Sequence, residues 1–337
     1  MKVVTTIQKA IYGAERICVK EKSDWITPSR FSEKQIRTFS KKPSLTAGFG
    51  RESFLLHSVA TAGITLDFLT DSTSLAFEYR GFAAANRQIC WFDILVNGRL
   101  FYHTGKNGQP SVAGKVSLTL PKGENRITVY FPCLYKGEIR NLSIDDGSSF
   151  IPAFEEKAHK RILFVGDSIT QGYATPYSSL TYTNILARKL HAECLNQGIG
   201  GAIYNHTDLD DSLSFSPDII VTAYGTNDWF WRRDIETTSQ EYYQRLVEIY
   251  PEAKIYALLP IWRGDSEELE LFSRRSFMEH REVIRKAAEM WGNVTVIDTI
   301  DFVPHDATFF EDRALHPNEL GFLLYADALV EAIQSNL

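Results

Sequence analysis

The chain has 337 residues, with 36 Lys and Arg against 42 Asp and Glu and a hydrophobic content of 44%. This composition is typical of a globular protein and excludes collagen-like, coiled-coil and disordered classes, while the net charge of −6 argues against nucleic-acid binding as the main task. Residues 1–155 carry a net charge of +6 and residues 156–337 one of −12, an asymmetry that predicts two separately packed domains.

Short strands are predicted throughout the first domain. They are rich in β-branched and aromatic residues, and Gly, Pro, Asn or Asp separates them. The expected strands cover residues 64–69, 74–79, 89–96, 100–103, 115–120, 125–131 and 139–144. Asn97-Gly98 between two of them indicates a two-residue hairpin. Because no long helical pattern occurs among them, residues 1–155 are expected to form an all-β sandwich or jelly roll.

After a linker at residues 150–160 the pattern changes to apolar strands that alternate with amphipathic helices. The expected strands cover residues 161–166, 194–198, 218–225, 254–260 and 294–298. The expected helices cover residues 182–191, 239–249 and 276–291, and one more follows Asn318. This alternation predicts an α/β domain at residues 156–337, with a parallel five-stranded sheet covered on both faces.

Residues suited to catalysis follow several of these strands or precede the last helix. In an open parallel sheet, ligands bind beyond the carboxyl ends of the strands, where Ser168, Gly201, Asn227 and His316 are expected to meet. Ser168 supplies a hydroxyl nucleophile, and His316 supplies a base suited to neutral pH. The backbone N–H groups of Ser168 and Gly201 and the Asn227 amide would stabilise an oxyanion. Each feature alone has an ordinary explanation as a turn or helix cap, but their combination predicts acyl transfer.

In these four blocks the sequence resembles the GDSL, or SGNH, serine hydrolases. The resemblance covers about residues 160–337, and it implies a three-layer flavodoxin-like fold and esterase or lipase activity. The order of the two domains is also similar to that of two-domain carbohydrate esterases, which remove acetyl groups from polysaccharides.

The last block departs from the family's usual Asp-x-x-His pattern. Arg313 stands where the family has its aspartate, and the nearest acid is Asp312, four residues before His316. We expect Asp312 to orient the imidazole. The alternatives are Asp306, Glu311 or a backbone carbonyl, which would leave a Ser–His dyad.

Aromatic residues cluster near the predicted site and are expected to bind substrate: Tyr173, Trp229, Trp231 and Trp262. Flat rings suit stacking on sugar faces, although they also suit acyl chains. The other seven histidines, His57 among them, are assigned to structural or surface positions. They show no metal-ligand spacing, so neither a metal nor another cofactor is expected.

The sequence therefore predicts a serine esterase that hydrolyses short-chain esters of a carbohydrate, most simply O-acetyl esters, through an acyl-enzyme. A lipase, lysophospholipase or thioesterase is the alternative enzyme, and a non-catalytic glycan-binding protein is the alternative outside enzymes. The expected partner is a small-molecule or oligosaccharide ester, with no nucleic acid and no membrane, and the sequence favours no oligomeric state. Because no secretory signal and no apolar run of about 18 residues is evident, a cytoplasmic location is expected.

Overall fold

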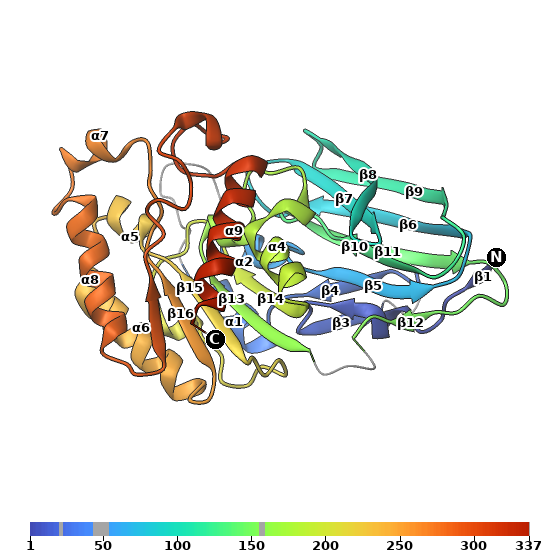
Figure 1. Ribbon diagram of the computed structural model, residues 1–337, viewed down its shortest axis with the longest axis horizontal. Helices are drawn as coiled ribbons and strands as arrows, with labels where there is room; N and C mark the ends of the chain where they lie inside the picture. Colours follow the sequence, from blue (N-terminus) through green and yellow to red (C-terminus); the bar gives the residue numbers. More distant parts are fainter. Residues whose placement is uncertain (20–22, 43–53, 155–158, 337) are drawn as a thin grey trace.

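The computed structural model describes residues 1–19, 23–42, 54–154 and 159–336. It places a pair of antiparallel sheets beside an α/β unit, and the amino terminus lies at the far end of the sheets (Figure 1). The boundary expected between residues 155 and 156, and with it the middle of the expected linker, lies outside the described residues.

The two antiparallel sheets form a sandwich. One has the strand order β3-β4-β11-β6-β9, with β1 paired to β11, and the other has the order β12-β5-β10-β7-β8, with β2 paired to β5. The bounds are β1 (Lys2–Val3), β2 (Ile11–Tyr12), β3 (Arg16–Val19), β4 (Ile26–Ser29), β5 (Thr65–Thr70), β6 (Ser74–Ala83), β7 (Ile89–Val96), β8 (Arg99–Asn107), β9 (Ser111–Thr119), β10 (Asn125–Tyr130), β11 (Tyr135–Ile144) and β12 (Ile151–Pro152). Alternate residues such as Phe68, Phe77, Phe92 and Ile127 face inward and share one apolar core.

The predicted strands of the sandwich correspond to β5 through β11, so the prediction of an antiparallel β-sandwich is confirmed. At the hairpin between β7 and β8, Asn97 and Gly98 have φ values of 52° and 79°. Positive φ at both central residues is what a type I′ turn requires, and Asn and Gly adopt it at low cost.

The α/β unit contains a parallel sheet built from five strands of the described chain. They are β13 (Lys160–Gly166), β14 (Ala192–Gly198), β15 (Ile219–Ala223), β16 (Lys254–Leu258) and β17 (Val294–Ile297), in the order β14-β13-β15-β16-β17. Helices α4 (Tyr182–Lys189) and α9 (Glu319–Gln334) pack on one face of this sheet, and α6 (Ile235–Ile249) and α8 (Phe277–Glu289) pack on the other. The three-layer α/β prediction is confirmed.

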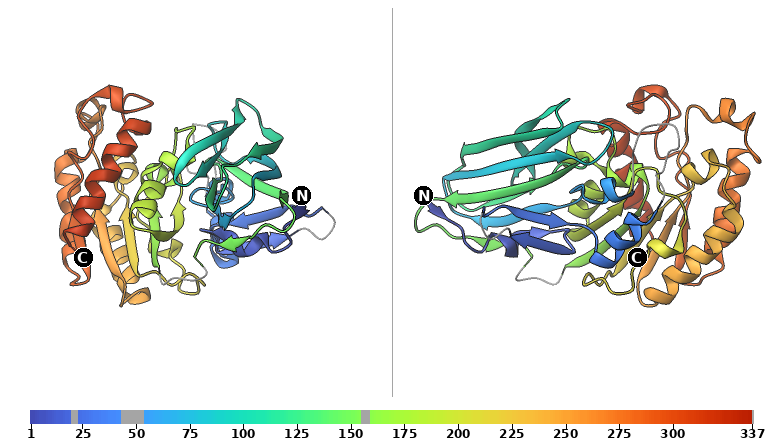
Figure 2. Two further views of the ribbon diagram at one scale, coloured as in Figure 1. Left: turned by 45° about the vertical axis from the view of Figure 1, so that its right-hand side comes forward. Right: turned by 180° about the vertical axis from the view of Figure 1, so that it is seen from behind.

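Two short helices of the first half pack against this parallel sheet and not inside the sandwich. They are α1 (Glu33–Ser40) and α2 (Phe54–Ser58), which the sequence analysis did not anticipate. Phe31, Phe39 and Phe54 share a core with Leu163 of β13 and Leu195 of β14. The connection at residues 199–218, described throughout, contains no α-helix, so α1 and α2 cover the sheet there (Figure 2).

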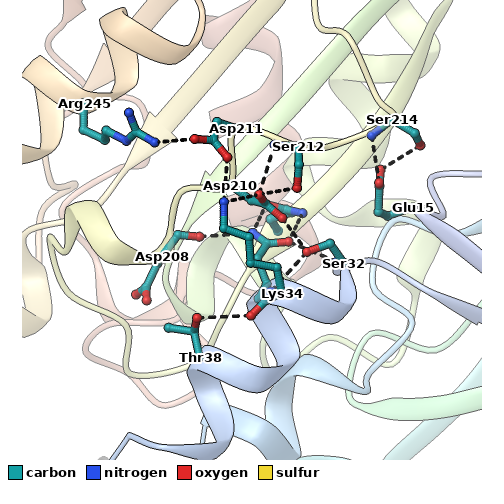
Figure 3. A network of polar contacts seen from close by, with 12 residues as sticks. Glu15, Ser32, Lys34, Thr38, Asp208, Asp210, Asp211, Ser212, Ser214 and Arg245 are labelled. Atoms are coloured by element: carbon teal, nitrogen blue, oxygen red, sulfur yellow. Dashed lines mark hydrogen bonds and ion pairs between the residues drawn. The ribbon is translucent and has the colours of Figure 1, made fainter.

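A polar network fastens α1 to that connection (Figure 3). Ser32, which caps α1, donates a hydrogen bond of 2.5 Å to the buried Asp210, and Lys34 lies 3.1 Å from the other oxygen of this carboxylate. Burial acts to raise the pKa of Asp210, but hydrogen bonds from Ser32, Ser212 and Lys34 together hold it below its ordinary value. Lys34 and Arg245 both contact Asp211, at 2.6 Å and 2.7 Å, but these groups are largely exposed and contribute little to stability.

Three of the four cysteines are buried, whereas Cys18 is exposed on β3. None of the helices in the described part of the chain combines the length and apolar character that crossing a bilayer demands.

Candidate active site

A cavity of about 210 Å³ opens at the carboxyl ends of β13, β14 and β15. Its walls include Ser168, Gly201, Asn227 and His316, so the structure brings these four predicted residues together. A larger groove of about 400 Å³ lies between α4 and the strands β5 and β10, and none of the candidate catalytic residues lines it. The smaller cavity is therefore the candidate active site, because its lining includes a hydroxyl nucleophile and a base that are hydrogen-bonded to each other.

A continuous chain of hydrogen bonds joins three side chains at this cavity. Ser168 Oγ lies 2.8 Å from His316 Nε2, and His316 Nδ1 lies 2.5 Å from Asp312 Oδ2. Because Nδ1 faces a carboxylate, it carries the proton, which leaves Nε2 free to accept the hydroxyl proton of Ser168. The arrangement is that of a serine nucleophile, its general base and an orienting acid.

The loop that carries Asp312 accommodates the altered spacing by one unusual backbone conformation. Arg313 has a φ of 63°, in the left-handed region, and this tight turn lets Asp312 reach back to His316. Asp312 Oδ1 accepts hydrogen bonds from the backbone N–H groups of Ala314, Leu315 and His316. Burial acts to raise the pKa of Asp312, but the hydrogen bonds and the imidazole hold it well below its usual range.

The alternative orienting acids are engaged elsewhere. Asp306 accepts a hydrogen bond of 2.8 Å from the backbone N–H of Thr308, and Glu311 forms an ion pair with Arg87 of the first half. The prediction that Asp312 faces His316 therefore agrees with the geometry.

Three potential oxyanion donors converge beside the serine. Ser168 is the first residue of the short helix α3 (Ser168–Gln171), which Asp167 caps, so its N–H has no partner within the helix. Gly201 has a φ of 77°, a conformation that favours glycine. Asn227, on α5 (Thr226–Phe230), donates one amide hydrogen to the carbonyl of Ala202 at 2.9 Å, which orients the carboxamide and leaves its second hydrogen.

Of the four aromatic residues expected to bind substrate, two line the cavity. Tyr173 packs against the His316 ring at 4.8 Å, and Trp231, 41% exposed, stands at the rim. Trp229 does not line the cavity, because it is 2% exposed, packs edge-on against Phe277 and donates its N–H to the carbonyl of Arg275. Trp262 also lies outside, stacked on His305.

The cavity also contains residues that the sequence analysis did not select: His57, Gly200, Phe230, Arg263 and Leu315. Phe230 and Leu315 adjoin predicted site residues and could have been chosen on that ground. No sequence signal marks His57, because only the docking of α2 (Phe54–Ser58) brings it to the cavity. Among the residues that the structure describes, no group of three or more His, Cys, Asp or Glu side chains is placed to hold a metal ion.

Two buried carboxyl groups lie behind the oxyanion donors. Burial raises the pKa of Asp167 to about 7 and that of Asp228 to about 7, and the charge of Asp228 adds to the effect on Asp167. Asp228 accepts a hydrogen bond of 3.2 Å from the backbone N–H of Tyr204, next to the glycine-rich loop. These groups are therefore protonated in the folded protein at pH values where an exposed aspartate is ionised.

Stability should consequently fall as pH rises from about 4 to about 7, because the unfolded chain releases these protons at the lower value. Asn at position 228 cannot ionise but can still accept the Tyr204 hydrogen bond. The difference in free energy of unfolding between Asp228→Asn and the wild type is therefore expected to depend on pH. It should favour the variant by on the order of 2 kcal/mol more at pH 8 than at pH 4.5. Urea unfolding at both pH values measures this, and an equal difference at the two would contradict the assignment.

Comparisons with known proteins support this description of the second domain. Residues 164–323 match the model of the GDSL-like lipase/acylhydrolase family. The comparison with curated protein sequences gives no match.

Solved structures match the whole two-domain arrangement. The salicylyl-acyltransferase SsfX3 from a tetracycline biosynthetic pathway is similar with a TM-score of 0.80 and 18% identity, over 99% of this chain and 97% of that one. A putative GDSL-like lipase from Bacteroides ovatus has a TM-score of 0.73 and 15% identity, over 98% and 96%. A family two carbohydrate esterase from Clostridium thermocellum, in complex with cellohexaose, has a TM-score of 0.61 and 20% identity, over 82% and 93%.

At these identities the solved structures establish a shared fold, while the family match identifies the second domain. The matched range contains all the residues of the hydrogen-bonded chain from Ser168 to Asp312. Residues 164–323 therefore match a GDSL-like lipase/acylhydrolase domain, and this family match supports an enzyme of the esterase and hydrolase class.

Proposed function

We propose that the protein is a serine esterase that removes short acyl groups, most simply acetyl groups, from a carbohydrate. The observation that carries this proposal is the hydrogen-bonded chain from Ser168 through His316 to Asp312 at the wall of a small cavity. A hydroxyl, a base and fixed oxyanion donors are the parts that ester hydrolysis requires.

In the acylation step, Ser168 Oγ attacks the ester carbonyl carbon while His316 Nε2 accepts the hydroxyl proton. The carbonyl oxygen becomes an oxyanion, which the N–H groups of Ser168 and Gly201 and the amide of Asn227 stabilise. His316 then gives its proton to the departing sugar oxygen as the C–O bond breaks, which leaves an acyl-enzyme. Water, activated by His316, attacks this ester in turn and releases the carboxylic acid and free Ser168.

The size of the cavity supports a short acyl group. Its volume of about 210 Å³ lies below the roughly 300–1,000 Å³ of pockets that hold drug-sized ligands. Phe230 and Trp231 are 40% and 41% exposed at its rim, where a sugar ring could stack on them. The similar fold of the Clostridium thermocellum carbohydrate esterase, solved in complex with cellohexaose, agrees with such a substrate.

A panel of esters tests the substrate class. The p-nitrophenyl acetate ester is expected to be hydrolysed with a kcat/KM about tenfold or more above that of the octanoate, because a long chain overfills the cavity. Trp231→Ala is expected to raise KM for an acetylated oligosaccharide about 5- to 10-fold while leaving KM for the simple acetate nearly unchanged. Trp262→Ala, which removes an aromatic ring outside the cavity, is the matched control.

Two results would contradict the carbohydrate proposal. Faster cleavage of octanoate than of acetate would favour a lipase, a lysophospholipase or a thioesterase on the same catalytic residues. An equal effect of Trp231→Ala on both substrates would remove the evidence for sugar binding.

Acyl transfer to an alcohol other than water is a second candidate. It is favoured by the match of both domains to a salicylyl-acyltransferase over 99% of this chain, and by the aromatic walls at Tyr173, Phe230 and Trp231, which would fit a flat acyl group. The same panel distinguishes it when it includes a salicylate ester and a sugar alcohol as acceptor, with the transferred product measured beside the free acid.

A further inference from the structure

The glycine-rich loop after β14 is hydrogen-bonded to α3, the helix that begins at Ser168. The backbone N–H of Gly200 donates a hydrogen bond of 2.7 Å to Oε1 of Gln171, the last residue of α3. Gln171 is fully buried and lies three residues after Ser168. It therefore links the two backbone segments that carry the proposed oxyanion donors, Ser168 N–H and Gly201 N–H.

Residues of the first half hold the Gln171 amide in this orientation. Its Nε2 donates to the carbonyl of Cys133 at 3.1 Å, so Oε1 is the atom that faces Gly200 and His57. His57 Nδ1 lies 3.2 Å from the same Oε1, and because that oxygen only accepts, Nδ1 carries the hydrogen. A β-carbon on Gly200 would lie 2.8 Å from His57 Cε1, so the imidazole packs directly on the glycine loop.

Arg30 connects the end of β14 to α2 by hydrogen bonds. Its fully buried guanidinium donates to the carbonyls of Asn196 and Gly198 at the end of β14, at 2.7 Å and 2.8 Å, and to those of His57 and Ala60. No carboxylate of the described residues forms an ion pair with it, and burial lowers its pKa to about 9. A buried cation satisfied by carbonyls alone fixes the backbone segments that it joins.

We infer that Gln171 is a positioning residue of the oxyanion hole, held in place by His57 and the Cys133 carbonyl, so that contacts from the first half of the chain contribute to catalysis in the second. This inference rests on the proposed function, because it assumes that Gly201 N–H stabilises the oxyanion. Gln171 acts through the Gly200 peptide, and its loss should affect the transition state more than the bound substrate.

The primary test replaces Gln171 by methionine, which keeps the length of the side chain but cannot hold Gly200. Gln171→Met is expected to lower kcat for p-nitrophenyl acetate about 10- to 100-fold with KM within about twofold, since one oxyanion donor is displaced and not removed. The rate advantage of the oxygen ester over its thionoester analogue should shrink as well, because sulfur is a poor acceptor for the donors of the hole.

A matched control separates positioning from loosening of the domain contact. Gln197 on β14 is also buried, and it bonds to the carbonyl of Arg30 and to Gln35, whereas the Gly200 N–H bonds to Gln171. Gln197→Met is expected to lower the melting temperature while keeping kcat and the ester-to-thionoester ratio of the wild type. If Gln197→Met reproduces the loss in Gln171→Met, or if Gln171→Met keeps both values, the inference is overturned.

A second pair of variants decides the matter if Gln171→Met does not fold. His57→Leu removes the Nδ1 donor and is expected to lower kcat and the ester-to-thionoester ratio, whereas His57→Asn keeps an N–H near Gln171 and should restore kcat to within about threefold of the wild type. Equal rates in the two variants would also overturn the inference. Failure of the proposed function is distinguishable, because then the wild type would not hydrolyse p-nitrophenyl acetate, or Ser168→Ala would hydrolyse it at the wild-type rate.

Discussion

Replacement of Ser168 by alanine is expected to reduce ester hydrolysis by a factor of about 10⁴ or more, down to the contribution of binding and the oxyanion donors. The side-chain hydrogen bond of Ser168 goes to His316, while the helix that follows is capped by Asp167. The variant should therefore fold normally. Turnover of p-nitrophenyl acetate and labelling by a serine-directed phosphonate measure the effect, and the phosphonate should label only the wild type.

A buried serine elsewhere provides the control. Ser239 lies in α6, donates to the carbonyl of Ile235 and does not line the cavity. Ser239→Ala should keep kcat and the phosphonate labelling of the wild type. If Ser168→Ala retains wild-type turnover, the assignment of the nucleophile is wrong, whatever the substrate.

Replacement of Asp312 by asparagine is expected to lower kcat by about 10³ to 10⁴, as loss of the corresponding acid does in serine proteases. The asparagine oxygen can still accept the backbone N–H groups of the loop, so the turn at Arg313 is kept. Its NH₂ group, however, would face His316 Nδ1 and favour the tautomer with hydrogen on Nε2, which cannot accept the serine proton.

Asp306→Asn is the matched control for this change. Asp306 is an acid of the same segment that caps Thr308, and asparagine preserves that hydrogen bond. Its kcat should stay within about twofold of the wild type. A mild effect of Asp312→Asn, comparable with that of Asp306→Asn, would mean that His316 works as a dyad with Ser168.

Much of the architecture follows from local sequence alone. Each of the strands β5 to β11 and β13 to β17 overlaps a predicted one, because alternating or continuous apolar residues between turn residues specify a strand wherever a core is available, although several strands of the sandwich extend beyond the predicted bounds. The residues directly after parallel strands, Ser168, Gly201 and Asn227, necessarily share one edge of the sheet. Their meeting could therefore be predicted without coordinates.

The path of the first 60 residues could not be predicted in this way. Helices α1 and α2 are short, and little in their own sequence separates them from a loop of the sandwich, apart from the capping box of Ser32 and Gln35. They are stabilised by Phe31, Phe39 and Phe54 packing against the parallel sheet, contacts with residues more than 100 positions away. Helical stability of this kind comes from tertiary packing and not from propensity.

The sequence by itself thus determined the two domains, their strands and the four residues that meet at the sheet edge, because periodicity and strand ends are local properties. The tertiary structure decided which neighbours complete the site. It placed Trp229 and Trp262 outside the cavity, because Trp229 packs against the ring of Phe277 and Trp262 against that of His305. It let the left-handed Arg313 bring Asp312 to His316, and it placed His57 and Arg30 against the glycine loop. Each of these depends on contacts between segments distant in sequence, which no local pattern of residues encodes.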